Sequence, residues 1–352
     1  MDRYIGIDVH AASSTVVVVN SKGKQVAQHV VETNGRALIE CLRLISGQRH
    51  LCIEEGTQSA WLYEILSPHV ADMTVMRVPE SRGQKSDQRD ALGLANKLRL
   101  GAIESPVFKD HGAYRTLREL VRVHSMVVAD VVRVQNRIKS FMRSRGIVTT
   151  GKKVYREASR KGFLKKLPEG TRTAVKTVYS EYDALAEIRG AAQKQLLTES
   201  RKHRITRVLQ SCPGIGPIRA AQLLPIVVTP HRFRTKRQFW SYCGLAIVTR
   251  TTSDWKRDKS GNWQKAKVPT TYGLNVNHNH QLKAIFKGAA TTVIMQLQKD
   301  PLYGDYKRMV DGGTKPNLAK LTLARKISAI VLSMWKNEEG YEPDKYRKAL
   351  SA

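Results

Sequence analysis

Four acidic residues stand out because the sequence around them is otherwise apolar or basic. They are Asp8, Glu54, Asp87 and Asp90. Asp8 lies in the apolar segment YIGIDVHAASSTVVVVN, where a buried carboxylate without a partner would be costly. Glu54 ends the apolar run LCIE, and Glu55 directly after it is the alternative. Asp87 and Asp90 are three residues apart, which places both carboxylates on one face of a helix.

These acids together could hold divalent cations. Carboxylates that converge repel one another, and one takes up a proton unless cations lie between them. Mg²⁺ prefers hard oxygen ligands, and a pair of such ions can stabilise the attacking and leaving oxygens of a phosphodiester displacement. Each acid alone has an ordinary explanation, such as a turn cap at Asp8 or a helix cap at Asp87. The ordered set favours a Mg²⁺ site.

The elements that must position these acids alternate between strands and helices. Strand patterns cover residues 4–19, QVAQHVVET after the turn SKGK, HLCIEEG and MTVMRVP. Helix patterns cover residues 37–45, AWLYEILSPHV and residues 85–101, the last ending at Gly101. This alternation predicts an α/β sheet domain over residues 1–105. If the strands that carry Asp8 and Glu54 are neighbours, the two carboxylates meet.

A helical and basic segment is expected over residues 106–205. Apolar positions recur at threes and fours over 114–145 and near heptad spacing over 172–204, so the two helices could pack as an antiparallel hairpin or pair with another chain. A packed pair with a solvated charged face is the plainer alternative. The stretch GKKVYREASRKGFLKK between them is predicted to be an irregular nucleic-acid loop. The phosphate-binding candidates here are Arg115, Arg118, Arg122, Arg133, Arg137, Lys152 and Lys153.

A third, mostly helical domain is expected over residues 206–335, with a tail over 336–352. It begins with VLQSCPGIGPIRAAQLLPIV, a helix, a glycine turn and a second helix, which resembles the helix-hairpin-helix motif. Gly214 and Gly216 would let backbone amides approach a phosphate at the start of the second helix. A plain helical turn is the alternative.

The net charge of +30, from 60 Lys and Arg against 30 acids in 352 residues, points to a polyanionic partner. A membrane surface is the alternative, but no apolar run approaches the roughly 18 residues of a spanning helix, and the N-terminus has no signal pattern. We therefore expect a cytoplasmic nucleic-acid-binding protein. Aromatic residues make up 7% of the chain, which favours backbone and duplex contacts over extensive base stacking.

Two further groups of residues are not expected to bind metal. The cysteines Cys41, Cys52, Cys212 and Cys243 lack paired zinc spacing and are expected in the core as thiols. His278 and His280, in NVNHNHQ, are poorly spaced for one ion, and a helix start with polar caps that contacts DNA is the better interpretation.

The chain resembles a transposase of the insertion sequence 110 family, the DEDD group. YIGIDVH, CIEEGT and KSDQRDALGLA resemble its acidic motifs, and CPGIGPIRAAQLL, RFRTKRQFWSYCGLAIVTRTTSDW and GLNVNHNHQLKAIFKGAA resemble its C-terminal transposase domain. The resemblance implies a RuvC-like (RNase H-type) domain, a dimerising coiled coil and a C-terminal domain with a serine nucleophile. It also implies a bridge RNA that pairs with donor and target double-stranded DNA, and a tetramer at the synapse.

The family places its nucleophile after the segment Gly244-Leu245, which makes Ser253 the first serine and the candidate. A hydroxyl that attacks phosphorus forms a phosphoserine intermediate and keeps the bond energy for rejoining. Thr252 occupies the family's usual offset, and Ser260 is the serine followed by glycine, so both stay open as alternatives. Arg250, Lys256 and Arg257 nearby would balance phosphate charge or contact the backbone.

Three functions are compatible with these residues. The leading hypothesis is an RNA-guided DNA recombinase that uses Mg²⁺ at the four acids and a nucleophile at Ser253. The alternatives are a RuvC-like endonuclease that cuts branched DNA with metal-activated water, and a nucleic-acid scaffold whose acids are structural. Loss of a protein-linked intermediate on mutation of Ser253 separates the first from the second.

Overall fold

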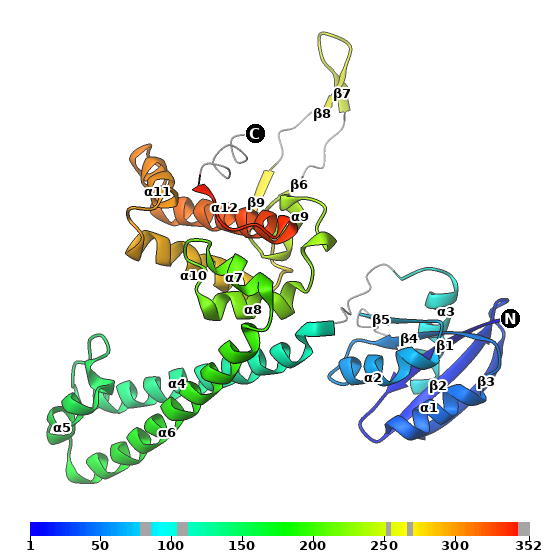
Figure 1. The fold of residues 1–352 in the computed structure, drawn as a ribbon, viewed down its shortest axis with the longest axis horizontal. Coiled ribbons are helices and arrows are strands. Elements are labelled where there is room, and N and C mark those ends of the chain that lie inside the picture. Colours follow the sequence, from blue (N-terminus) through cyan, green and yellow to red (C-terminus); the bar gives the residue numbers. More distant parts are fainter. Residues whose placement is uncertain (78–85, 104–111, 251–254, 266–269, 344–352) are drawn as a thin grey trace. The chain divides into compact units, whose positions relative to one another are not determined.

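The computed structural model describes residues 1–77, 86–103, 112–250, 255–265 and 270–343. The chain divides into two compact units, Met1–Asp110 and His111–Ala352, called unit 1 and unit 2 below. Unit 1 is built on a β-sheet and unit 2 is mostly helical (Figure 1).

Unit 1 contains one five-stranded mixed sheet with helices packed on it. The strands are β1 Asp2–Val9, β2 Ser13–Asn20, β3 Gln25–Glu32, β4 Gln48–Glu54 and β5 Asp72–Met76. The helices are α1 Gly35–Leu44, α2 Ser59–Leu66, the short 3-10 turn Ser67–His69, and α3 Asp87–Arg99. The strand order is β3-β2-β1-β4-β5, with β1, β2 and β3 antiparallel and β1, β4 and β5 parallel. The predicted α/β sheet is confirmed.

Helices cover both faces of this sheet, which explains the run of valines in β2. Val16 and Val18 belong to the core cluster that includes residues of α1 and α2, whereas Val17 and Val19 pack with α3. A β-strand buried on both sides needs no alternation of polar and apolar residues. Gly6 allows α3 to lie close to β1, because a Cβ at this position would be 1.9 Å from the carbonyl oxygen of Ala91.

The prediction of one strand over residues 4–19 was wrong. The chain leaves the sheet after Val9 and returns at Ser13, so the segment forms the hairpin of β1 and β2, closed by a hydrogen bond from the His10 amide to the Ser13 carbonyl (3.0 Å). The turn carries no glycine or proline, so the usual turn residues are missing. As a result Asp8 lies at the end of a strand and not in its middle.

Unit 2 contains two long helices and a group of shorter ones. Its longer elements are α4 Arg115–Arg143, α5 Glu157–Lys165, α6 Glu169–Ser200, α7 Arg204–Gln210, α8 Pro217–Val227, α9 Lys236–Tyr242, α10 His280–Gln296, α11 Pro301–Asp311 and α12 Pro316–Asn337. Its 3-10 turns are Gly112–Tyr114, Lys153–Tyr155 and Pro230–Arg232. Its strands are β6 Ile247–Arg250, β7 Trp255–Arg257, β8 Trp263–Lys265 and β9 Thr270–Leu274. Strand β6 pairs with β9, and β7 pairs with β8.

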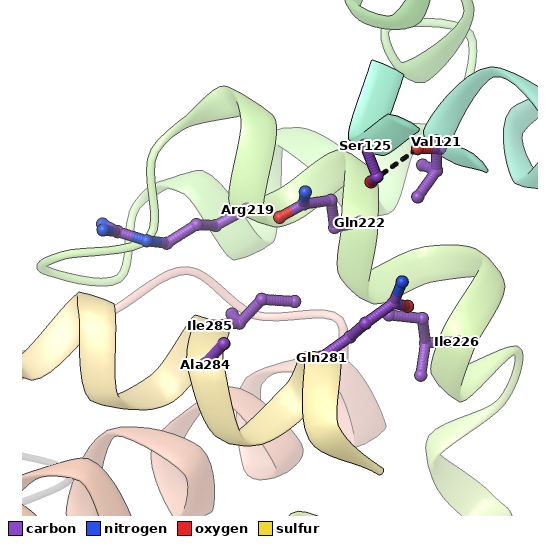
Figure 2. Close-up of a pocket in the computed structure, with 8 residues that line it drawn as sticks. All are labelled: Val121, Ser125, Arg219, Gln222, Ile226, Gln281, Ala284 and Ile285. Atoms are coloured by element: carbon purple, nitrogen blue, oxygen red, sulfur yellow. Dashed lines mark hydrogen bonds between the residues drawn. The ribbon is translucent and has the colours of Figure 1, made fainter. Parts of the chain in front are cut away.

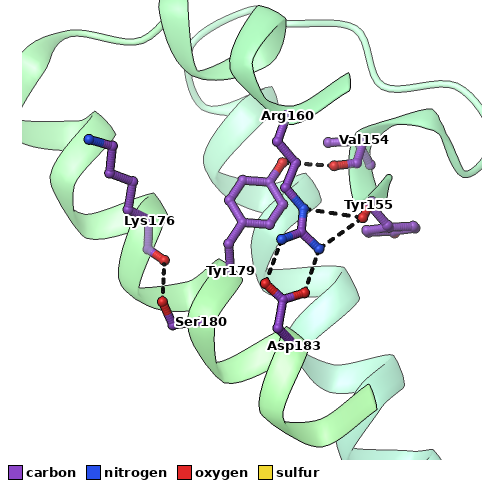
Figure 3. A network of polar contacts seen from close by, with 7 residues as sticks. All are labelled: Val154, Tyr155, Arg160, Lys176, Tyr179, Ser180 and Asp183. Carbon is purple, nitrogen blue, oxygen red and sulfur yellow. Dashed lines mark hydrogen bonds and ion pairs between the residues drawn. The ribbon is translucent and has the colours of Figure 1, made fainter. Parts of the chain in front are cut away.

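The helices α4 and α6 lie side by side, as the apolar spacing predicts (Figure 1). The stretch between them is not the irregular loop that we predicted, because it contains a 3-10 turn and α5. Val154 is buried there, and Phe163 packs against the same cluster as Tyr179. Figure 3 shows how Arg160 ties α5 to α6 through Asp183, with its two Nη atoms 2.6 Å from the two carboxylate oxygens. Apolar contacts and one ion pair therefore order a sequence that looked only basic.

The remaining helices of unit 2 pack around a second apolar core that includes Phe239 and Phe286. The predicted helix, glycine turn and helix are confirmed as α7 and α8, and α10 starts at the predicted place with Asn279 as its N-cap. All four cysteines of the chain are buried with free thiols, as expected. Among the helices that the structure describes, none has the length and apolar character needed to cross a bilayer.

Candidate active site

The register of the sheet brings Asp8 and Glu54 to the same edge. Strands β1 and β4 are parallel and paired up to Ile7 and Ile53, so Asp8 and Glu54 follow on neighbouring strands. Side chains alternate along a strand, and Gly6, two residues before Asp8, faces α3. Asp8 and Glu54 therefore lie on the α3 side of the sheet. The two strands are neighbours in the sheet, which is the condition under which the sequence predicts that Asp8 and Glu54 meet.

Helix α3 brings the other two acids to this side. Its N-cap is Ser86, whose hydroxyl accepts a hydrogen bond from the Arg89 amide (3.3 Å), and Asp87 and Asp90 occupy the first turn. Carboxylates in the first turn are favoured by the unpaired amides and the dipole of the helix. The Ser86 cap sets the first residue of α3 and therefore places Asp87 and Asp90 in its first turn.

His10 is a member of the site that the sequence analysis missed. Its Nε2 lies 3.4 Å from Asp8 Oδ2 and 3.3 Å from Asp87 Oδ1. Within the described ranges, these are the three residues whose ligand atoms lie close enough together, within 4.8 Å, to hold a metal ion. No local pattern in the sequence marks His10, because β1 ends at Val9 and His10 begins the turn that leads into β2.

The electrostatics of Asp8 reflect this crowding. Burial raises the pKa of the Asp8 carboxyl, the negative charges of Asp87 and Asp90 raise it further, and His10 and the Val9 amide oppose the rise. The side chain of Asp8 is 15% exposed, whereas that of Asp87 is 59% exposed. A cation between these carboxylates would remove the repulsion, so the donor set of carboxylate oxygens and one imidazole fits a divalent metal ion.

A cleft of about 350 Å³ opens at this edge of the sheet. It is lined by Asp8, Val9, His10, Ala11, Glu54, Glu55, Gly56, Thr57, Gln58, Ser59 and Leu62. The turn after β4 is held by Ser59, whose hydroxyl accepts from the Gly56 amide (2.7 Å) and donates to the Glu54 carbonyl (3.4 Å). Both candidate glutamates line the cleft, but strand alternation places Glu54 on the side of Asp8 and Glu55 on the opposite side.

A second cavity, of about 250 Å³, lies in unit 2 between α4, α8 and α10 (Figure 2). Its lining is mostly apolar, with Ser125, Gln222 and Gln281 as polar members and Arg219 at its border. The Arg219 guanidinium donates to the Gly214 carbonyl (2.7 Å) and to Thr292 Oγ1 (3.0 Å). Its lining contains no carboxylate, so the cleft in unit 1 is the better candidate for metal-dependent chemistry.

The C-terminal nucleophile candidates are placed only in part. Ser253 and Thr252 lie outside the described residues, and Ser260 lies in the exposed turn between β7 and β8, where its amide donates to Asp258 Oδ1 (2.9 Å). Cys243, Gly244 and Leu245, eight to ten residues before Ser253, are buried. Gly244 has a positive φ of 65°, and a Cβ there would be 2.3 Å from the His278 ring.

The predicted phosphate-binding residues are on the surface of unit 2 where the structure describes their side chains. Arg115, Arg118, Arg122, Arg133, Arg137, Lys152, Lys153, Lys256 and Arg257 are exposed. Arg133 pairs with Asp130 and Arg137 with Glu181, and such exposed pairs are weak enough to exchange for phosphate.

The two glycines of the helix-hairpin-helix-like turn have different surroundings. Gly214 has a φ of +81°, and a Cβ there would be 2.6 Å from the Ala289 carbonyl oxygen, so close packing on α10 already requires glycine. Gly216 is the N-cap of α8 and has open space around its Cα. Phosphate binding at this turn stays a prediction.

Comparison with known families decides the broad identity. Residues 5–145 match a family model described as a transposase, of the DEDD type of IS110 elements. Residues 206–303 match a second model, described as the transposase IS116/IS110/IS902 family. The chain belongs to the IS110 family of transposases. The resemblance inferred from the motifs is confirmed, and so is the fold class, an RNase H-like N-terminal domain followed by a mostly helical C-terminal transposase domain.

This IS110 family transposase is similar to two bacterial proteins. The insertion element IS116 uncharacterized 44.8 kDa protein of Streptomyces clavuligerus is 23% identical over an alignment of 400 positions, which covers 97% of this chain and 96% of the relative. A putative transposase, y4qE, of Sinorhizobium fredii is 23% identical over 270 positions, 72% of this chain and 65% of the relative. The chain is therefore a transposase, an enzyme that cleaves and joins DNA.

Proposed function

We propose that this transposase is an RNA-guided DNA recombinase with a Mg²⁺-dependent site at Asp8, Glu54, Asp87 and Asp90. The observation that carries the proposal is the convergence of acids from β1 and α3, with Asp8 Oδ2 and Asp87 Oδ1 both within 3.4 Å of His10 Nε2. Two further observations support the proposal: Glu54 follows Ile53 on the strand that neighbours Asp8, and the charge of Asp90 acts on Asp8. Acids from separate elements meet here at one edge of the sheet.

The residues of this site have distinct tasks. Asp8 and Asp87 would hold the metal most directly, with Glu54 in the lining of the cleft beside Asp8 and Asp90 three residues after Asp87 in the first turn of α3. When bound, Mg²⁺ supplies Lewis-acid stabilisation of the charge that develops on phosphate oxygens. His10 orients the two carboxylates it contacts and offsets part of their negative charge.

The nucleophile in this proposal is the hydroxyl of Ser253. Its Oγ forms a bond to phosphorus while the bond from phosphorus to the leaving DNA oxygen breaks, and that oxygen takes up a proton. A hydroxyl of the other DNA strand then attacks the phosphoserine, which restores Ser253 and joins the strands. The Gly244–Leu245 segment, after which the family places its nucleophile, is held in unit 2 by a hydrogen bond from Arg325 Nε to the Leu245 carbonyl (2.6 Å).

The partners in this proposal are a bridge RNA, donor DNA and target DNA. The net charge of +30 and the exposed basic residues of α4 support a large polyanionic ligand. Exposed apolar side chains on the long helices, Val123, Met126, Val132 and Ile188, support pairing with a second copy, and we propose a dimer that forms a tetramer at the synapse. As both relatives are bacterial, we place the protein with the nucleoid in the cytoplasm.

The decisive experiment tests for a protein-linked DNA intermediate. The full chain, with the RNA that copurifies with it, is incubated with donor and target DNA and Mg²⁺, and DNA-linked protein is measured on denaturing gels. We expect the adduct in the wild type and its loss in Ser253→Ala and Asp8→Asn. Thr252→Ala and Ser260→Ala are matched hydroxyl controls that should retain it.

Other outcomes identify the alternatives. Cleavage that persists in Ser253→Ala without an adduct would indicate a RuvC-like endonuclease that uses water. A wild-type protein that binds nucleic acid but never cuts would indicate a scaffold. Sequencing of the copurifying RNA tests guidance, because a discrete RNA with segments matching the DNA flanks is expected, whereas random cellular RNA would contradict it.

A further inference from the structure

The hairpin of β7 and β8 presents two tryptophans on one face. The register pairs Trp255 with Lys265, Lys256 with Gln264 and Arg257 with Trp263. Residues directly opposite each other in an antiparallel pair share a face, and so do alternate residues of one strand. Trp255, Arg257 and Trp263 therefore occupy the same face, called the tryptophan face below.

These two tryptophans are more exposed to solvent than the other three tryptophans of the chain. Trp255 is 58% exposed and Trp263 is 60% exposed, whereas Trp335 is 6% exposed and Trp61 is 38% exposed. Trp240, the remaining one of five, donates its indole N–H to the Arg325 carbonyl. Large aromatic rings in solvent are typical of binding surfaces.

The charge of the residues around the tryptophan face indicates the charge of the ligand that would bind there. The hairpin, residues 255–265, contains four basic residues and one acid, Asp258. Asp258 is engaged within the hairpin, because its carboxylate accepts from the amides of Ser260 and Asn262 (2.9 Å each) and from Gln264 Nε2 (2.7 Å). The hairpin thus has a hydrogen-bonded turn and an excess of basic residues, which is complementary to a polyanion.

Arg257 connects the charge to the aromatic rings. Its guanidinium carbon lies 5.1 Å from the centre of the Trp263 ring, in the range of a cation–π contact. Aromatic rings beside basic side chains bind single-stranded nucleic acid through stacking of bases and contacts to phosphates. A protein partner would also suit exposed tryptophans, but four basic residues against one acid in the hairpin favour a nucleic acid.

We propose that the tryptophan face is a stacking platform for unpaired bases of a single-stranded nucleic acid. This rests on the proposed function, since Trp255 lies two residues after Ser253 and would hold a strand near the reacting phosphate. The low aromatic content of the chain is compatible with the proposal, because two of its few aromatic rings are concentrated on one hairpin.

The test measures binding of the full chain to labelled oligonucleotides in EDTA, so that no catalytic step contributes. The probes are a 20-nucleotide single-stranded DNA, an RNA of the same sequence and the matching DNA duplex. We expect Trp255→Ala and Trp263→Ala each to weaken single-strand binding about tenfold or more and to change duplex binding less than twofold. Trp255→Phe and Trp263→Phe should retain most of the affinity, and Trp61→Phe is the control for a tryptophan elsewhere.

Tryptophan fluorescence gives a second measurement. If Trp255 and Trp263 had only a structural role, adding single-stranded nucleic acid would not quench their emission. Stacked bases should quench the emission that is present in the wild type and missing in the Trp255→Phe, Trp263→Phe double variant. Loss of affinity for DNA alone or RNA alone identifies which strand uses the platform. Unchanged single-strand binding in the double alanine variant, or an equal loss of duplex binding, would overturn the proposal, whatever the result of the adduct experiment.

Discussion

The acid site of unit 1 and the tryptophan face of unit 2 are built in opposite ways. In unit 1, Asp8 is 15% exposed and is held between a sheet and a helix whose backbones nearly touch at Gly6. In unit 2, Trp255 and Trp263 stand in solvent on a two-stranded hairpin. Chemistry at phosphorus needs donors fixed to fractions of an ångström, whereas stacking on bases tolerates movement. The comparison predicts that perturbing unit 1 changes rates and that perturbing the hairpin changes affinities.

Loss of a proposed metal ligand should have the largest effect. Asp87→Asn removes one of the two carboxylates that flank His10, so we expect strand cleavage in Mg²⁺ to fall by about a thousandfold or more. Chelation with EDTA should have the same effect on the wild type. Binding of single-stranded DNA should change less than twofold, and Glu40→Gln, an exposed acid of α1, should leave both quantities unchanged. If Asp87→Asn cleaved DNA at the wild-type rate, Asp87 would not be part of the metal site.

The close contact of β1 and α3 should dominate the stability of unit 1. In Gly6→Ala the new Cβ would be 1.9 Å from the Ala91 carbonyl oxygen and 2.7 Å from the Ala95 amide nitrogen, so α3 must move away. We expect unfolding free energy to fall by about 1–3 kcal/mol or more, measured by chemical denaturation, and cleavage to fall because Asp87 and Asp90 move with the helix.

Gly93→Ala is the matched control on the same helix. Gly93 lies inside α3, and a Cβ added there would meet no atom of a neighbouring element within 4 Å, so alanine should raise the unfolding free energy by about 0.5–1 kcal/mol. Equal stabilities of the Gly6 and Gly93 variants would show that α3 does not approach β1 so closely.

The ion pair of α5 and α6 provides a smaller test, on the side of unit 2. Arg160 donates to both oxygens of Asp183 and to the Tyr155 carbonyl, and it lies 4.6 Å from the Tyr179 ring (Figure 3). Arg160→Ala should cost about 1–2 kcal/mol of unfolding free energy. Because Arg160 lowers the pKa of Asp183, the contribution of the pair is present above about pH 4 and is lost as the pH falls through that lowered pKa. The difference in unfolding free energy between wild type and Asp183→Asn should therefore be larger at pH 7 than at pH 3, measured by chemical denaturation at both pH values.

The sequence predicted more of unit 1 than of unit 2, for physical reasons. Hydrophobic periodicity in the sequence predicts the strand-end acids and the Asp-x-x-Asp pair on a helix. The grouping of Asp8, Glu54 and Asp87 could therefore be predicted from the sequence. His10 was missed because it becomes a neighbour of Asp87 only after the chain turns at residues 10–12, where Ala11 and Ala12 give no turn signal.

In unit 2, local composition misled where tertiary contacts decide the structure. The stretch before α6 looked irregular because basic residues conceal Val154 and Phe163, which are ordered by packing against Tyr179. The tryptophan face was not predicted, because a low aromatic content says nothing of where the rings are. Their shared face depends on the β7–β8 register, which three-residue strands do not reveal in a sequence.

The smallest expected effect is that of Asp8→Asn on thermal stability without metal. This substitution should raise the melting temperature although it should abolish activity. Burial and the neighbouring charges of Asp87 and Asp90 raise the pKa of Asp8, so the folded state binds a proton more readily there than the unfolded state does. The carboxyl is therefore most favourable to folding below its unfolded pKa of 3.8, and this contribution is lost as the pH rises through the raised pKa. In EDTA at pH 7, Asp8→Asn should melt at a slightly higher temperature than the wild type, and the difference should vanish near pH 3.

Added Mg²⁺ should reverse the order at pH 7, because the wild-type carboxylates gain a ligand that the amide binds poorly. If Asp8→Asn were less stable than the wild type in EDTA at pH 7, the Asp8 carboxylate would stabilise the fold by itself, and its role would be structural and not metal binding.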